Sequence, residues 1–204
     1  MQTRVHHHSP FSQARKLMSL LTLIVVFAVS AFGQSADRNA RAAQWESYKP
    51  ATGKFVRFVD RQKGYVLWHP ADWKERPGSD NIRMFMPGPQ SANLLVLNET
   101  IPEGFGVTDY TSSYLQGLKN QATIEDSLMV RRVMMNGLEW REVSYDIDQQ
   151  GTAVHQTVWL TAIGARAYGF ALTTVLTDLE KDEPILKRTM LNVRIGAAGH
   201  WNEE

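Results

Sequence analysis

Hydrophobic residues after position 54 occur in short runs separated by glycine, proline and polar turns. The run Tyr65–His69 contains aromatic and branched residues, follows Gly64, and ends at Pro70, which has no N–H for a ladder bond. This pattern predicts a short buried strand that stops at the proline. The residues that follow the proline, 71–73, are enough for one tight turn, which would fold Trp73 back over the edge of the sheet.

The stretch 68–73 has two interpretations. In the first, Trp73 is a large apolar ring that fixes the end of the strand by packing on the sheet. In the second, aromatic and polar side chains form a binding site on the surface: Trp68, His69, Asp72 and Trp73. We favour the first interpretation and keep the second as a candidate binding site.

The same patterns predict seven further strands, of which 93–99 should be central because its apolar run is continuous. Asn136-Gly137 is a strong hairpin signal, so the last four strands should form an antiparallel meander. The polar segment 74–81 is expected to be a loop. The expected strands cover 55–59, 82–86, 93–99, 127–135, 138–147, 152–162 and 167–174.

Helical spacing predicts one helix from Thr108 to about Gln121 and a second after position 177. Pro184 predicts a break or a restart in the second helix, because proline removes a backbone hydrogen bond. Residues 193–195 are expected to form a final extended segment. The apolar face of the first helix would carry Tyr110, Tyr114, Leu118 and Gln121.

The N-terminal segment 1–33 has the three parts of a secretory signal peptide. It contains Arg4, Arg15 and Lys16 without an acidic residue, then an apolar run, then small residues before Gln34. An uncleaved membrane anchor is the alternative, but the apolar run is shorter than the roughly 20 residues that span a bilayer. We therefore expect an exported bacterial protein, periplasmic or secreted, with a leader at 34–54, a domain at 55–196 and a tail at 197–204.

The amino-acid composition excludes several classes of chemistry. The chain has no cysteine, which excludes disulfides, thiol nucleophiles, thiolate zinc sites and a lipid-modified cysteine anchor. Removal of residues 1–33 leaves 19 basic residues of the 22, against 21 acidic ones, so the net charge becomes about −2. Nothing in this balance indicates binding of nucleic acid, and no stable membrane anchor remains after cleavage.

The segment Phe55–Gly64 and the Pro-x-x-Trp run that ends at Trp73 resemble the opening of the PsbP-like fold superfamily. Ala167–Thr174, a helix and Val193–Ile195 resemble its ending. This superfamily includes extrinsic proteins of photosystem II, DcrB-like bacterial periplasmic proteins and the Ran-binding Mog protein of yeast. The resemblance implies an α+β fold, in which an antiparallel β-sheet is flanked by helices on both faces (an α/β/α sandwich). It carries over no catalytic residue and no manganese or calcium ligand set.

Candidate chemistry is sparse. No serine elbow, P-loop or dinucleotide fingerprint is present, and we expect no cofactor. His69 and His155 with Asp72 are the alternative: a two-histidine, one-carboxylate metal site, if the sheet brings them within about 5 Å. Trp140 and Trp159 on adjacent strands suggest either core or a partner-binding aromatic patch.

We therefore expect a non-enzymatic accessory or binding module that contacts a protein or another partner in the cell envelope. An enzyme that binds a metal or a small ligand through His69, Asp72 and His155 is the second hypothesis. Carriage of an apolar ligand between sheet and helix is a third, and it requires an apolar cavity.

Overall fold

The structure is a computed structural model that describes residues 53–87, 92–119, 127–149 and 151–196. The predicted signal peptide, nearly all of the predicted leader and the predicted tail lie outside the described residues. The elements are β1 (Phe55–Asp60), β2 (Tyr65–Pro70), β3 (Lys74–Pro77), β4 (Ile82–Met86), β5 (Asn93–Thr100), α3 (Val107–Lys119), β6 (Met129–Met135), β7 (Leu138–Gln149), β8 (Thr152–Ile163), β9 (Arg166–Val175), the 3-10 turn η2 (Leu176–Asp178), α4 (Leu179–Asn192) and β10 (Arg194–Ile195).

A seven-stranded antiparallel sheet forms the centre of the fold, in the order β3-β4-β5-β9-β8-β7-β6. The meander predicted for the last four strands is confirmed, because β6 to β9 are neighbours in sequence order. Its first turn has φ of 54° at Asn136 and 75° at Gly137, the left-handed conformations that a two-residue hairpin needs. The continuous apolar run of β5 lies between β4 and β9, as a strand covered on both faces should.

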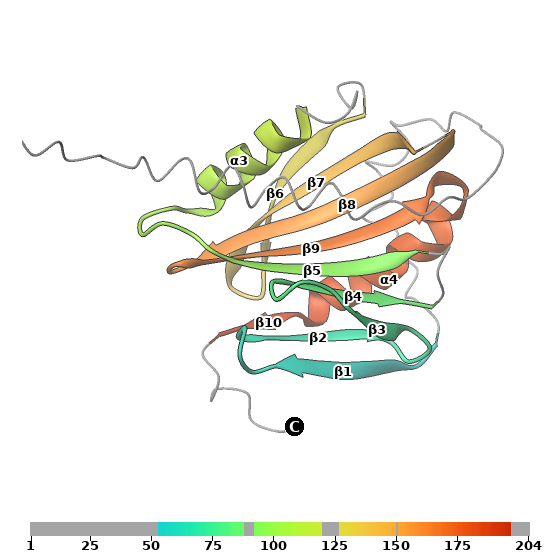
Figure 1. Ribbon diagram of the computed structural model, residues 1–204, viewed down its shortest axis with the longest axis horizontal. Coiled ribbons are helices and arrows are strands. Elements are labelled where there is room, and N and C mark those ends of the chain that lie inside the picture. Colours follow the sequence, from blue (N-terminus) through green and yellow to red (C-terminus); the bar gives the residue numbers. More distant parts are fainter. Residues whose placement is uncertain (1–52, 88–91, 120–126, 150, 197–204) are drawn as a thin grey trace, which may run out of the picture.

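A second, three-stranded sheet has the order β1-β2-β10. Figure 1 shows this small sheet and α4 on one side of the large sheet and α3 on the other. The core consists accordingly of two clusters, one between the large sheet and the layer of α4 and the small sheet, the other beneath α3. The predicted fold class, α+β with helices on both faces of an antiparallel sheet, is confirmed.

Several polar contacts join the small sheet and its β1–β2 turn to the large sheet. Arg83 in β4 donates from Nε to Asp60 Oδ2 in β1, at 2.8 Å. The hydroxyl of Tyr168 in β9 donates to the carbonyl of Lys63, at 3.0 Å. Together with the apolar side chains that pack between the two sheets, these contacts fix the sheets relative to each other.

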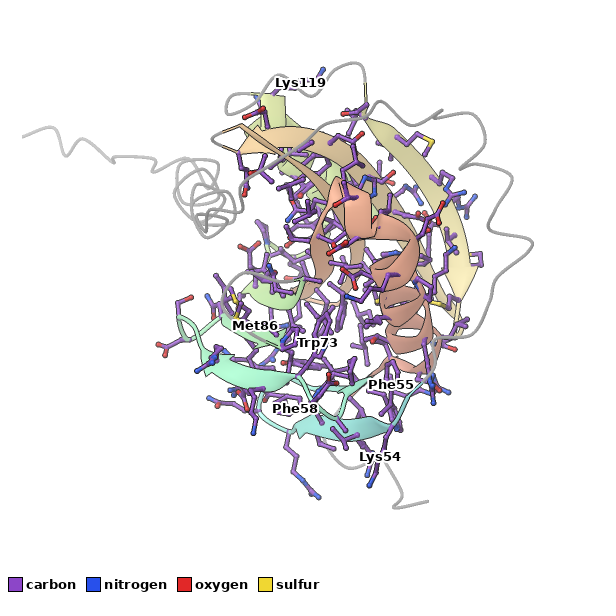
Figure 2. The ribbon with its side chains drawn as sticks, turned by 90° about the vertical axis from the view of Figure 1, so that its right-hand side faces the viewer. Lys54, Phe55, Phe58, Trp73, Met86 and Lys119 are labelled. Atoms are coloured by element: carbon purple, nitrogen blue, oxygen red, sulfur yellow. The ribbon has the colours of Figure 1, made fainter. Side chains whose placement is uncertain are left out.

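The chain turns tightly after β2, as the sequence predicts. The N–H of Trp73 donates to the carbonyl of Pro70 at 3.0 Å, and the indole is only 5% exposed. Figure 2 shows Trp73 and Phe58 on the interior side of the small sheet, where Trp73 is part of the α4-side core and Phe58 packs against it. Trp73 is therefore the buried ring of the first interpretation.

Two predictions of secondary structure are wrong. Lys74–Pro77 is a strand that pairs with β4 and not part of a loop, because edge pairing through the backbone needs no apolar pattern. Pro184 does not break the second helix, since α4 runs through it from Leu179 to Asn192. The buried side chains of Leu186 and Met190 hold the helix on the core and offset the one hydrogen bond that proline removes.

Candidate functional site

The tryptophans of the meander lie in the core. Trp140 is 0% exposed and Trp159 is 4% exposed. Their rings meet edge to face with centroids 6.5 Å apart, and the indole N–H of Trp140 donates to the carbonyl of Met135 at 3.2 Å. Neither ring offers an exposed aromatic patch, so the core interpretation holds for both. Of the candidate tryptophans, Trp68 alone is partly exposed.

His69 faces the interior of the small sheet. Its ring stacks on Phe85, and Nδ1 lies 2.8 Å from the carbonyl oxygen of Pro70. Burial lowers the pKa of His69, because the charged form loses water. Asp72, in contrast, is exposed at the turn after β2. These two members of the predicted site therefore lie in different environments.

The predicted metal site of His69, Asp72 and His155 does not form in the described part of the chain. No group of three or more histidine, aspartate or glutamate side chains that could hold a metal ion is found among the described residues. His155 lies in the large sheet, on β8, whereas His69 lies in the small one. Sequence reasoning placed all three near one another only because it could not separate the two sheets.

His155 instead belongs to a relay that the sequence analysis missed. Its Nδ1 lies 2.6 Å from Oδ1 of Asp146 on β7, and its Nε2 lies 3.0 Å from the hydroxyl of Thr157. Asp146 and His155 are direct partners across the β7–β8 hairpin. Counting back from the turn at Asp148-Gln149-Gln150-Gly151 would have paired them, so the hairpin register was the available signal.

The relay has the order carboxylate, imidazole, hydroxyl that activates a nucleophile in hydrolases. Its environment is different, however, because His155 and Thr157 are both buried. On the neighbouring strand β9, Thr174 donates to Asp182 of α4 at 2.5 Å, and burial raises the pKa of Asp182. These contacts make a buried polar layer that joins α4 to the sheet.

A second buried polar network lies beneath α3. The hydroxyls of Tyr114 and Tyr145 are 2.9 Å apart, Tyr145 donates to Gln156, and Gln156 donates to Thr173 at 2.9 Å. Burial raises the pKa of Tyr145 to about 12, so its hydroxyl stays neutral. The network crosses β7, β8 and β9 and links them to the helix, which gives it a structural role.

The two outer edges of the large sheet differ in character. At one edge, β3 is short, and Lys74, Glu75 and Arg76 are all exposed and charged. At the other, β6 has seven residues, and its exposed side chains include Met129, Val130 and Met134. Short charged strands protect an edge against further pairing, whereas a long apolar edge invites it. The β6 edge is therefore the candidate functional site.

No protein-family model matches the sequence, and no curated protein matches it. Solved structures do match. Cyanobacterial PsbP (CyanoP) from Synechocystis sp. PCC 6803 is similar at 14% identity and a TM-score of 0.57, over 72% of this chain and 95% of that one. LpqN, described as involved in cell envelope biogenesis of Mycobacterium tuberculosis, is similar at 10% identity and a TM-score of 0.51, over 70% and 90%.

The chain has a PsbP-like fold. A Bacteroides thetaiotaomicron protein is similar at 17% identity and a TM-score of 0.50, over 72% of this chain and 50% of that one. The PsbP-like resemblance inferred from the opening Pro-x-x-Trp run and the closing strand is thereby confirmed. The described helices include none that is long and apolar enough to cross a membrane.

Proposed function

We propose that this protein is an exported, non-enzymatic accessory module that binds a protein partner in the cell envelope. The observation that carries the proposal is the exposed apolar edge strand β6. An extended segment of the partner would pair with β6 and so add a strand to the large sheet.

The side chains of β6 suit such a contact. Met134 is 63% exposed and Val130 is 44% exposed, although both are apolar. The two arginines between them are paired with carboxylates on β7: Arg131 with Glu142 at 2.7 Å and Arg132 with Glu139 at 2.6 Å. These ion pairs lower the charge along the strand, which leaves the backbone and the apolar side chains to determine binding.

The fold and its neighbours support an accessory role. CyanoP is a PsbP protein and LpqN is described as involved in cell envelope biogenesis, and a shared fold transfers no reaction by itself. Within the described residues, the one catalytic-like relay is buried at His155 and Thr157. The predicted signal peptide at 1–33 accounts for export.

Site-specific photo-cross-linking in the host tests the proposal. A photoreactive residue at Met134 should capture a discrete partner from the envelope fraction, and the double substitution Val130→Lys and Met134→Lys should abolish co-purification of that partner. Charged residues on an edge oppose strand addition, so the fold should persist while binding is lost. Ile163→Lys is the matched control, because Ile163 is apolar and 37% exposed but lies at the end of β8.

The proposal fails if Met134 captures nothing while a probe at Ile163 does, or if the control substitution weakens co-purification as much as the β6 substitutions. Circular dichroism and a thermal melt of each variant show whether the fold is intact. The same partner must be recovered with both approaches.

A further inference from the structure

Among the described residues, the outer face of the small sheet carries arginines and aromatic rings, and its strands place no carboxylate there. Phe58, Tyr65 and Leu67 point to the core, so the alternate positions of β1 and β2 point outward. Directly paired residues share a face, which places Arg57 beside Trp68 and Val59, Val66 and Arg194 in one row. Val66 is only 1% exposed, so it belongs to the row but not to the accessible surface. We name the accessible residues, with Phe55 and the neighbouring Arg188 of α4, the arginine–tryptophan face: Phe55, Arg57, Val59, Trp68, Arg188 and Arg194.

The rings on this face are in contact with guanidinium groups. The Cζ atom of Arg57 lies 5.9 Å from the centroid of the partly exposed Trp68 ring. The Cζ atom of Arg188 lies 4.1 Å from the centroid of Phe55, which Figure 2 shows next to α4 at the end of the small sheet. Stacking on a ring orients a guanidinium group without neutralising its charge.

Within the described part of the chain, no ion pair offsets the charge of Arg57 or Arg194. Arg194 donates to the carbonyls of Leu191 and Val193, at 3.3 and 3.0 Å. The acidic residue of β1, Asp60, lies at an inward position and binds Arg83. The face is therefore locally cationic, although the processed chain is expected to be slightly acidic overall.

We propose that the arginine–tryptophan face binds the surface of a membrane that contains anionic phospholipids. Arginine forks suit phosphate oxygens, and tryptophan prefers the level of the lipid headgroups. Screening limits electrostatic attraction to about 8 Å at physiological salt, so the local charge of this face and not the net charge decides the contact. The proposal is independent of the β6 edge, which lies on the large sheet, and it implies that the protein bridges a membrane surface and a protein.

The test uses the protein purified from its host in the processed form, mixed with vesicles of phosphatidylcholine with or without phosphatidylglycerol. Co-sedimentation should require phosphatidylglycerol and should decrease as salt is raised. Each arginine contributes about 1 kcal/mol near an anionic surface, so the double substitution Arg57→Gln and Arg194→Gln should weaken binding roughly thirtyfold. Trp68→Ala should weaken it further, and Arg57→Lys should preserve most of it because the charge is retained.

The matched control is Lys74→Gln with Arg76→Gln, which removes the same charge from the exposed strand β3. It should leave vesicle binding within about twofold of the unmodified protein. Equal binding to both kinds of vesicle, or an equal loss in the control, overturns the proposal. The proposal is also overturned if the unmodified protein binds no vesicles and a photoreactive residue at position 68 cross-links to an acidic protein. The partner of this face is then a protein.

Discussion

The imidazole ring of His69 stacks on the phenyl ring of Phe85, with ring centroids 4.5 Å apart and planes at 28°. His69 belongs to the small sheet and Phe85 to the large one, so this contact spans the interface of the two sheets. A protonated ring in this apolar contact would lose its hydration, which is why burial lowers the pKa of His69.

We predict that protonation of His69 destabilises the fold as the pH falls. Because the folded pKa lies below the ordinary value of about 6.5, the unfolded chain binds the proton more readily, and stability is lost below that value. The free energy of unfolding in urea should therefore fall less between about pH 8 and about pH 5 in His69→Gln than in the unmodified protein. An NMR titration midpoint of His69 at or above 6.5 would contradict the prediction.

Gly64 and Gly196 provide a test of the junction between β2 and the end of β10. Gly64 has φ of 77°, and a Cβ added there would lie 2.8 Å from the carbonyl oxygen of Gly196. Gly137 is the matched control, because its φ is 75° and a Cβ there would meet nothing within 4 Å. Both substitutions to alanine should cost about 1–2 kcal/mol for the left-handed backbone, and Gly64→Ala should cost at least about 1 kcal/mol more for the clash. If urea unfolding shows equal losses of stability for the two variants, the backbone at the junction moves to accommodate the added Cβ, and the prediction is wrong.

Trp140 and Trp68 should differ sharply in their contribution to stability. Trp140 is fully buried and meets the rings of Trp159 and Phe170, so Trp140→Ala should lower the free energy of unfolding by about 3–5 kcal/mol. Trp68→Ala removes a partly exposed ring and should cost clearly less. Chemical denaturation of the two variants measures the difference. If Trp68→Ala is the more destabilising one, the ring is a core element and its use as a binding residue is wrong.

The hydrogen bond between Tyr114 and Tyr145 should show as an interaction energy in a double-mutant cycle. Tyr114→Phe should cost about 0.5–1.5 kcal/mol, because it removes one hydrogen bond while Tyr145 stays bonded to Gln156, and Tyr145→Phe should cost about 1–3 kcal/mol, because it leaves buried partners unsatisfied. Tyr145→Phe should cost more, since it also removes the donor to Gln156. The double variant should be less destabilised than the sum by about 0.5 kcal/mol or more. Strict additivity in urea unfolding would contradict the network.

Local chemistry explains what could be predicted. The stop at Pro70, the turn that returns Trp73 and the Asn136-Gly137 hairpin each depend on backbone restrictions of residues adjacent in the chain. Local chemistry could not predict strand β3. Lys74–Pro77 has no strand pattern of side chains, and it becomes a strand only by backbone pairing with β4. The candidate edge strand β6 was predicted as a strand, but its position at the edge was not.

By itself, the sequence determined the order of the strands and helices except for β3, the PsbP-like α+β fold class and the lack of thiol chemistry. Tertiary structure alone decided that β1 and β2 form a separate sheet, that His69 and His155 lie apart, and that Trp140 is core while Trp68 reaches the surface. The physical reason is that a strand's pattern says which side chains share a face, but not what covers that face. Long-range pairing and packing settle this, and they bring residues from distant parts of the chain together.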